Sequence, residues 1–303
     1  MSIPESQLKT WSHQGAVTTA KQTHESIRAA LKAYDWPKEV RYEVYLQGSY
    51  KNDTNIRRDS DVDVVVQLNS TFLFNSAFFE NLPVNPKRQF GFRDASYGWE
   101  EFRRDVLKAL LNRYGPGRVR EGRKSLKVQT PYLPADVVVS LQYRKYPDRP
   151  RSEADFIEGM AFWVRSEGRW VINYPKLHYE NGVKKNGVKK NQGNQGTNGW
   201  YKPTVRMFKN ARTYLVDRGV IPADLAPSYF LECLLYNVPD DKFGTNFQST
   251  FLKVITWLLK ADFSRFDCQN EQLPLFGSSP EQWSEDRAYR FLEAMVRLWN
   301  DWR

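Results

Sequence analysis

The spacing of hydrophobic residues changes along the chain from a strand period to a helix period. Runs with every second residue apolar, or with consecutive valines, predict strands in the first half. These strands are expected at 40–46, 61–68, 118–128, 135–143, 162–164 and 170–172. The last two flank a Glu167-Gly168 turn, which predicts a hairpin. Recurring apolar residues predict helices over 5–34 and 99–114.

The second half begins with a polar segment and continues with a helical pattern. Residues 181–191 carry the tandem NGVKK-NGVKK, and the polar, glycine-rich composition up to Gly199 predicts a solvated loop at a lobe boundary. Helices are expected at 202–217, 228–236, 247–259 and 282–302. The order favours an α+β fold with a mixed-sheet lobe over 1–180 and a helical lobe over 181–303, with the N-terminal helix spanning both.

Composition narrows the class of protein. The chain has no apolar run of about 18 residues and no signal-like start, so we expect a cytoplasmic protein without a membrane span. Two cysteines and three histidines cannot build a Cys-rich structural zinc site. The net charge of +10 favours a nucleotide, a nucleic acid or a membrane surface as partner, although many basic proteins bind nothing in particular.

Three aspartates stand at the heads of apolar strands. Asp61 and Asp63 share one face of a strand, and Asp136 precedes three valines on another strand that could lie beside it. Neighbouring carboxylates repel each other, and a divalent cation such as Mg²⁺ compensates them. Three carboxylates can hold two ions, one activating a ribose hydroxyl and one steadying the triphosphate and leaving pyrophosphate. A lone Asp-x-Asp would instead indicate ordinary turn and strand-start residues.

Gly48 and Ser49, upstream of these aspartates, change that balance. Gly48 lets the backbone approach a phosphate, and Ser49 offers both its N–H and its hydroxyl to phosphate oxygens. On its own, Gly-Ser carries no information, because it occurs by chance in most proteins. Together with the aspartates it predicts a site for a nucleoside triphosphate.

Gly48-Ser49, Asp61-Val62-Asp63 and Asp136 together resemble the signature of the DNA polymerase β-like nucleotidyltransferases. The string QGSYKNDTNIRRDSDVDVVVQL resembles more closely the CD-NTases, bacterial relatives of cyclic GMP-AMP synthase and oligoadenylate synthase. The resemblance covers most of the chain. It implies a polymerase β-like lobe with a mixed sheet, a helical C-terminal lobe, and an active site in the cleft between them. It also implies NTP substrates, two Mg²⁺ ions on the three aspartates, for which Mn²⁺ can substitute, and a cyclic dinucleotide messenger for an effector protein in antiphage (CBASS-type) defence.

The second lobe contains further candidate nucleotide-binding residues. Lys202, Arg206 and Lys209 share one helical face, which would leave a basic stripe free for a triphosphate or merely be solvated. The resemblance implies that Lys209 and Ser228 contact the donor triphosphate and that Tyr229 stacks on a base. The alternative for Tyr229 is a core tyrosine.

Asn173 is a candidate reader of the base. It ends the strand Trp170-Val171-Ile172-Asn173, and its amide can donate and accept together, as the edge of uracil requires. The resemblance associates asparagine here with pyrimidine use, so UTP is the hypothesised donor. The alternative is that Asn173 merely caps a strand before Pro175.

Several partners and rival functions follow from the same residues. The cleft could be edged by lysines that attract nucleotides, namely Lys184, Lys185, Lys189 and Lys190. Activation by DNA is not implied, because the related cyclic GMP-AMP synthase binds DNA with a zinc-binding insertion. This chain has too few cysteines and histidines to build such an insertion. The rivals are a template-independent RNA terminal transferase, an antibiotic nucleotidyltransferase and a catalytically silent nucleic-acid-binding module. The second-lobe match argues against the antibiotic enzyme, and the three acids argue against the binding module.

Overall fold

The computed structural model describes residues 2–15, 17–57, 61–75, 91–187 and 196–302, which form two compact units. A sheet unit comprises Val17–Gln47 and Ser60–Lys176, and a helical unit comprises Met1–Ala16, Gly48–Asp59 and Leu177–Arg303. The expected α+β class is confirmed. The assignment of 1–180 and 181–303 to functional lobes stays a prediction.

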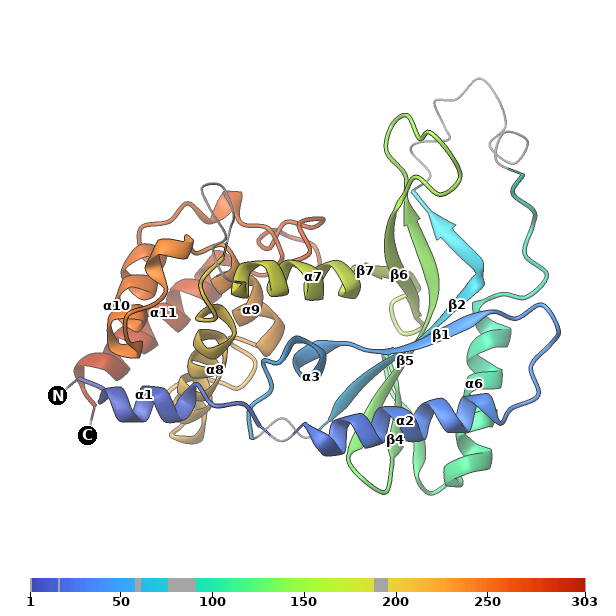
Figure 1. The fold of residues 1–303 in the computed structure, drawn as a ribbon, viewed down its shortest axis with the longest axis horizontal. Coiled ribbons are helices and arrows are strands. Elements are labelled where there is room, and N and C mark those ends of the chain that lie inside the picture. Colours follow the sequence, from blue (N-terminus) through green and yellow to red (C-terminus); the bar gives the residue numbers. More distant parts are fainter. Residues whose placement is uncertain (1, 16, 58–60, 76–90, 188–195, 303) are drawn as a thin grey trace. The chain divides into compact units, whose positions relative to one another are not determined.

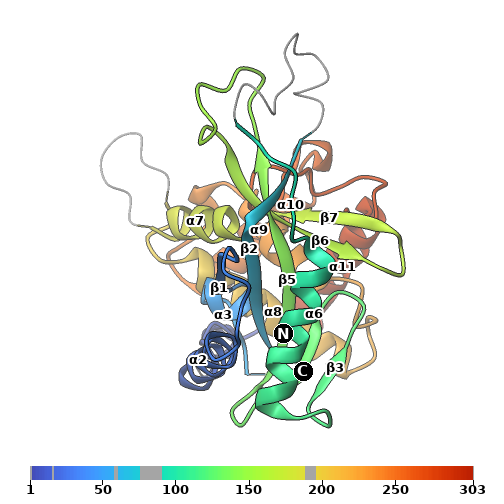
Figure 2. The same cartoon turned by 90° about the vertical axis from the view of Figure 1, so that its right-hand side faces the viewer.

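The sheet unit is built on a mixed sheet whose order is β1-β2-β5-β4-β3, with β6 on β5 and β7 on β6. Its strands are β1 Tyr42–Leu46, β2 Val62–Phe74, β3 Val119–Glu121, β4 Leu126–Gln129, β5 Pro134–Lys145, β6 Ile157–Val164 and β7 Arg169–Asn173. Strands β2 and β5 run parallel and lie side by side (Figure 2). The other pairs are antiparallel, and the predicted β6–β7 hairpin is confirmed.

Side chains of the sheet alternate between its two faces. One face carries an apolar cluster that includes Val65, Val138 and Phe162. Helices α2 (Thr18–Lys32) and α6 (Trp99–Tyr114) pack against the sheet and each other (Figure 1). The indole N–H of Trp99 donates to Val139 O at 2.9 Å, which fixes α6 against β5. The α6 bounds match the predicted helix.

The helical unit surrounds a large aromatic and aliphatic core, in which Phe208, Phe230, Phe251 and Phe291 are fully buried. Its α-helices are α1 Glu5–Trp11, α3 Gly48–Asn52, α7 Pro175–Asn186, α8 Tyr201–Asp217, α9 Ser228–Tyr236, α10 Phe247–Leu258 and α11 Glu285–Asn300, and its 3₁₀-helices are Asp240–Lys242 and Phe263–Arg265. Helix α7 begins at the end of the sheet unit. The helices expected beyond residue 200 are confirmed, with small differences at their ends.

The single N-terminal helix predicted over 5–34 is wrong. Helix α1 ends at Trp11 in the helical unit, and α2 starts at Thr18 in the sheet unit. Gly15 lies against another segment: its N–H donates to Asn55 O at 3.0 Å, and a Cβ on it would lie 2.8 Å from Ile56 O. This close backbone approach interrupts the helix that the local pattern favours.

The solvated loop predicted for the tandem repeat is wrong for its first copy, which is helical within α7. Gly182 lets the helix approach Gln269, since a Cβ would lie 2.5 Å from Gln269 Nε2. Lys185 is buried and donates to Val238 O at 2.8 Å and Asp240 Oδ1 at 2.9 Å. It therefore cannot attract nucleotides from solvent, whereas Lys189 and Lys190 lie outside the described residues.

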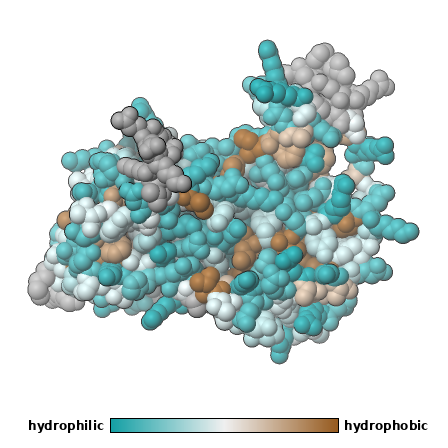
Figure 3. All heavy atoms as spheres, in the orientation of Figure 1, coloured by the Kyte–Doolittle hydropathy of each residue, from teal (hydrophilic) through white to brown (hydrophobic). Residues whose placement is uncertain are grey.

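The described part of the chain has no helix that is both long and apolar enough to cross a membrane. Hydrophilic residues cover most of the face drawn in Figure 3, and hydrophobic residues appear there only in small patches.

Candidate active site

Asp63 of β2 lies opposite Asp136 of β5 in the parallel register. Neighbouring residues of paired strands point to the same face, so both carboxylates lie on the face that carries Val65 and Val138. Asp61 directly precedes β2 and is exposed. The sheet thus brings Asp63 and Asp136 together, and the role of the three aspartates as metal ligands stays a prediction.

Lys127 of β4 lies opposite Asp136 in the sheet, so Asp63, Asp136 and Lys127 form a row of charged groups across three neighbouring strands. Its Nζ lies 3.3 Å from Asp136 Oδ1, and the lysine side chain is 55% exposed. Within the described ranges, no three or more His, Cys, Asp or Glu side chains form a ready-made metal cluster. The donor chemistry of Asp61, Asp63 and Asp136 nevertheless fits Mg²⁺, which prefers hard carboxylate oxygens.

The Gly48-Ser49 turn comes just after β1, the strand that pairs with β2. Gln47 N donates to Asp63 O at 3.0 Å, so the last residue of the sheet unit before the turn is fixed beside Asp63. Gly48 has a φ of 66°, in the left-handed region that favours glycine, and it begins α3. Ser49 O accepts from Thr54 N at 3.0 Å, which closes the turn after α3.

A buried carboxylate holds the segment after this turn within the helical unit. Glu232 of α9 accepts hydrogen bonds from Asn52 Nδ2 at 3.1 Å and Thr54 Oγ1 at 2.5 Å, and its Oε2 lies 3.0 Å from His178 Nε2. Burial alone would raise the pKa of Glu232, but the hydrogen bond and charge of His178, with the charge of Lys209, hold it below its usual value. The segment is therefore fixed by a charged, desolvated hydrogen-bond network.

The cations of α8 also hold this segment, so the basic stripe predicted to be free is not free. Lys202 Nζ donates to Asp53 Oδ2 at 2.8 Å, and Lys209 Nζ donates to Thr54 O at 2.9 Å. Arg206 donates to Ser12 O and to Asp53 O. Lys209 is fully buried. Direct contact of these three residues with a nucleotide stays a prediction.

Ser228 and Tyr229 begin α9 and are partly exposed. The Tyr229 ring stacks on His178, with centroids 5.2 Å apart and planes 23° apart, and its hydroxyl accepts from Asn270 Nδ2 at 3.3 Å. Burial raises the pKa of Tyr229 well above its usual value, so its hydroxyl is protonated at neutral pH. The tyrosine is an ordered, partly exposed ring, and its stacking on a base stays a prediction.

Asn173 is the last residue of β7. Its Oδ1 accepts from Tyr174 N at 2.8 Å, which is the strand-capping contact expected as the alternative. The contact also orients the amide, so that the NH₂ group is left to donate elsewhere. Capping and base reading are therefore compatible at this residue.

Sequence reasoning missed Lys127, His178 and Glu232. Glu232 is the lone charge in the apolar helix SYFLECLLY, a signal of a buried, paired carboxylate. Sequence reasoning also missed Lys176, whose Nζ lies 2.7 Å from Glu43 Oε1 and 2.8 Å from Glu158 Oε1. These partners are distant in sequence, so no local pattern links them.

Known proteins share the sequence of this chain far beyond the aspartates. The model of the cGAS/DncV-like nucleotidyltransferase C-terminal helical domain matches residues 185–300. The cyclic UMP-AMP synthase of Rhodothermus marinus is 64% identical over 302 residues, which cover 100% of this chain and 99% of that protein. The cyclic nucleotide synthase CdnE01 of Staphylococcus haemolyticus is 40% identical over 309 residues, which cover 100% of both chains.

A solved structure is similar in fold as well. The Rhodothermus marinus CdnE c-UMP-AMP synthase with Apcpp and Upnpp superposes with a TM-score of 0.91 at 63% identity, over 99% of this chain and 97% of that chain. The resemblance found in the carboxylate segment is confirmed, since the similarity extends through both units. Identity at this level over the whole length places the chain in the cGAS/DncV-like nucleotidyltransferase (CD-NTase) family.

Proposed function

We propose that this chain is a cyclic dinucleotide synthase that condenses UTP and ATP into cyclic UMP-AMP. The observation that carries the proposal is the register of Asp63 with Asp136, in a chain 64% identical to a cyclic UMP-AMP synthase. The choice of bases is further supported by the similar enzyme solved with Apcpp and Upnpp, which carry adenosine and uridine.

The proposed reaction consists of two similar transfers. In each, a ribose hydroxyl oxygen of one nucleotide bonds to the α-phosphorus of the other, and the bond from that phosphorus to the oxygen of the β-phosphate breaks. Pyrophosphate leaves, and the hydroxyl proton passes to solvent. The first transfer gives a linear dinucleotide and the second closes the ring.

Asp61, Asp63 and Asp136 would hold two Mg²⁺ ions, for which Mn²⁺ can substitute. When bound, these ions neutralise charge on the triphosphate and make the attacking hydroxyl more acidic. The chain contributes the placement of the ligands, because Asp63 and Asp136 are fixed by backbone pairing rather than by flexible loops. Lys127 compensates the charge of Asp136 in the absence of a cation.

Gly48, Ser49 and Ser228 bind the triphosphate in this account. The glycine allows a close approach of the backbone, and the two serines offer hydroxyl donors. Lys202 and Lys209 act as positioning residues, because their ammonium groups hold Asp53 and Thr54, only a few residues after Ser49. Their charge also favours an anion near this segment.

Base choice is assigned to Asn173 and Tyr229. The Asn173 NH₂ group donates to the O4 atom of uracil, with its orientation set by Tyr174 N. Tyr229 offers one ring face to a base while His178 covers the other. Stacking of this kind contributes about 1–3 kcal/mol per base.

The test is to incubate the purified protein with Mg²⁺ and α-³²P-labelled NTPs, each alone and in mixtures. Products are treated with phosphatase and separated by chromatography. One phosphatase-resistant product that carries label from both UTP and ATP supports the proposal. A resistant product without uridine contradicts the base assignment, and ladders that require added RNA indicate a terminal transferase instead. The absence of any product would leave an enzyme that requires an activator, or the silent binding module.

The proposed product is a messenger for a separate effector protein in antiphage defence, as the family membership suggests. Nothing in the proposed chemistry requires DNA as an activator.

A further inference from the structure

A cavity lies in the sheet unit, on the face of the sheet opposite Asp63 and Asp136. It has a volume of about 430 Å³, and Val137 and Val139 of β5 form part of its floor. Because side chains alternate along a strand, these valines point away from the face that carries Asp136. The cavity is therefore separate from the proposed catalytic row, although both share one strand.

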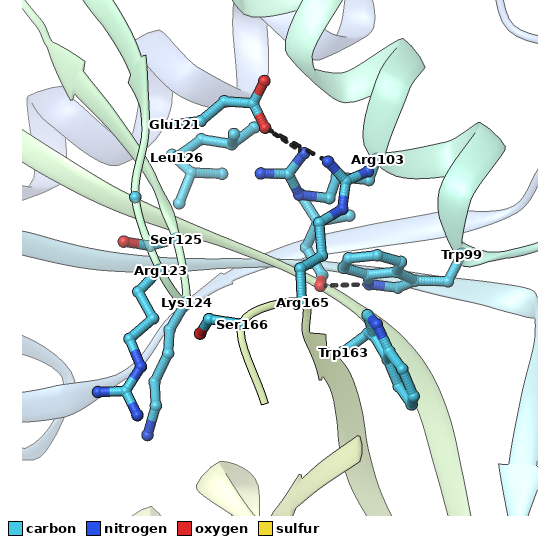
Figure 4. Close-up of a pocket in the computed structure, with 13 residues that line it drawn as sticks. Trp99, Arg103, Glu121, Arg123, Lys124, Ser125, Leu126, Trp163, Arg165 and Ser166 are labelled. Carbon is cyan, nitrogen blue, oxygen red and sulfur yellow. Dashed lines mark hydrogen bonds and ion pairs between the residues drawn. The ribbon is translucent and has the colours of Figure 1, made fainter. Parts of the chain in front are cut away.

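One end of the cavity is aromatic. Trp99 of α6 is fixed by its hydrogen bond to Val139 O, and Trp163 of β6 lies close to it and is partly exposed (Figure 4). Trp170 makes edge contacts with both, at centroid distances of 6.0 Å and 5.4 Å. Trp99 and Trp163 line the cavity, and their contacts with Trp170 hold them in place, so they offer an apolar surface that suits a planar ring.

The other end of the cavity is cationic. Arg123 and Lys124 extend from the turn between β3 and β4 and are exposed, with Ser125 and Ser166 beside them (Figure 4). In the described chain, Lys124 makes no ion pair, and the hydroxyl groups of the two serines make no hydrogen bond. These groups are donors without acceptors at the mouth of a cavity.

The acidic groups nearby do not neutralise this end. Arg103 and Arg165, at the aromatic end, already pair with Glu121 and Glu100. Glu167 is shared between Arg123 and Arg169, so one carboxylate faces two guanidinium groups. The hydrogen bond from Arg123 holds the pKa of Glu167 below its usual value, so this carboxylate is already ionised and cannot supply further charge. The positive charge of Lys124 remains in excess.

We propose that this cavity binds a nucleoside 5′-phosphate, with its base against Trp99 and Trp163 and its phosphate on Arg123 and Lys124. The size is right, since pockets for small ligands span about 300–1,000 Å³. An aromatic wall at one end and donors at the other match a ligand that is planar at one end and anionic at the other. The proposal does not rest on the proposed catalytic function.

The test measures binding of AMP, without Mg²⁺, by calorimetry on the full chain carrying Asp63→Asn, which removes the chemistry but not this cavity. We expect the added double substitution Arg123→Glu/Lys124→Glu to weaken AMP binding by about tenfold or more, because two charge-assisted contacts are reversed. Lys38→Glu/Arg149→Glu is the matched control, since both residues are exposed on the same unit and the net charge changes equally. The control protein should bind AMP like its parent.

A third variant separates a nucleotide site from a plain anion site. Trp163→Ala should weaken AMP binding while leaving the weaker binding of ribose 5-phosphate unchanged. Equal binding of AMP to the Glu double variant and to its control would overturn the proposal, as would equal loss of both ligands in Trp163→Ala. A single-stranded oligonucleotide that binds through Arg123 and Lys124 where AMP does not would also overturn it, in favour of a nucleic-acid surface.

Discussion

His178 Nε2 lies 3.0 Å from Glu232 Oε2, and both side chains are almost completely buried. The same carboxylate accepts hydrogen bonds from Asn52 and Thr54, in the segment that follows Gly48-Ser49. A buried charge with three donors is costly to disturb, because each group left without a partner bears its full desolvation penalty. The pair thus connects the stability of the helical unit to the position of the proposed phosphate-binding turn.

Replacing Glu232 tests this connection. We expect Glu232→Gln to lower the free energy of unfolding by about 1–3 kcal/mol, since an amide cannot accept from all three donors. Synthesis should also slow, because Asn52 and Thr54 lose their anchor. Urea unfolding and initial rates measure the two effects, with the exposed Glu180→Gln as control. Unchanged stability in Glu232→Gln would refute the role of the network.

The effect of Glu232 on stability should depend on pH in a defined direction. The pKa of Glu232 is lowered in the folded protein, so its contribution is complete above the unfolded pKa of about 4.3 and is lost as pH falls through the folded value. The difference in unfolding free energy between the wild-type protein and Glu232→Gln should therefore be full at pH 7 and shrink below about pH 4. A difference that grows on acidification would contradict the lowered pKa.

Gly15 is required by a close backbone contact and not by its φ angle. Gly15→Ala should destabilise the protein by about 1–3 kcal/mol, because the new Cβ would meet Ile56 O at 2.8 Å and the backbone must shift. Gly117→Ala is the matched control, since a Cβ there meets nothing within 4 Å. Thermal unfolding of both variants gives the comparison, and equal melting temperatures would show that the segment relaxes without cost.

The N-terminal helix shows where prediction from sequence reaches its limit. Helix α6 and the β6–β7 hairpin were predicted correctly because their apolar period, Gly115 and the Glu167-Gly168 turn are local signals. The break at Gly15 was missed because its cause is Asn55, distant in sequence. The composition of residues 181–185 predicts a loop for the same reason, since it does not reveal that Gly182 packs on Gln269.

The candidate site divides in the same way. The aspartates and Gly48-Ser49 were identified because a short polar pattern interrupts apolar strands. The sequence does not reveal the partners of Lys202, Arg206 and Lys209 in α8. Amphipathic spacing gives the face of a helix on which a residue lies, but not which residues cover that face. Lys202 and Lys209 meet Asp53 and Thr54, some 150 residues away.

Lys127 should compete with the divalent cation for Asp136. Lys127→Met removes an ammonium that lies 3.3 Å from the carboxylate, so the Mg²⁺ concentration for half-maximal synthesis should fall. The side chain of Lys127 is more than half exposed to solvent, so its ion pair with Asp136 contributes only about 0.2–1 kcal/mol. The Mg²⁺ concentration for half-maximal synthesis should therefore fall by at most about fivefold. The test is to measure the rates of synthesis of both proteins across a Mg²⁺ titration. A higher Mg²⁺ requirement in Lys127→Met than in the wild-type protein would mean that Lys127 assists Mg²⁺ binding instead.

Asn173 should determine the preference for uridine. Asn173→Ser removes the NH₂ donor but leaves a small polar group that can still accept from Tyr174 N. We expect the variant to lose selectivity for UTP over other NTPs in competition assays by about tenfold, the value of one hydrogen bond to a base edge. An Asn173→Ser enzyme with the same nucleotide preference would restrict the residue to its capping role.

The most direct test of the proposed enzyme is the yield of doubly labelled, phosphatase-resistant product from UTP and ATP in single aspartate variants. Asp63→Asn and Asp136→Asn should each lose about a thousandfold in rate or more, because removal of a carboxylate removes charge stabilisation in the transition state. Both should retain the wild-type circular dichroism spectrum, and Asp148→Asn, exposed on the same unit, should retain wild-type synthesis. Near wild-type synthesis by Asp63→Asn or Asp136→Asn would contradict the account.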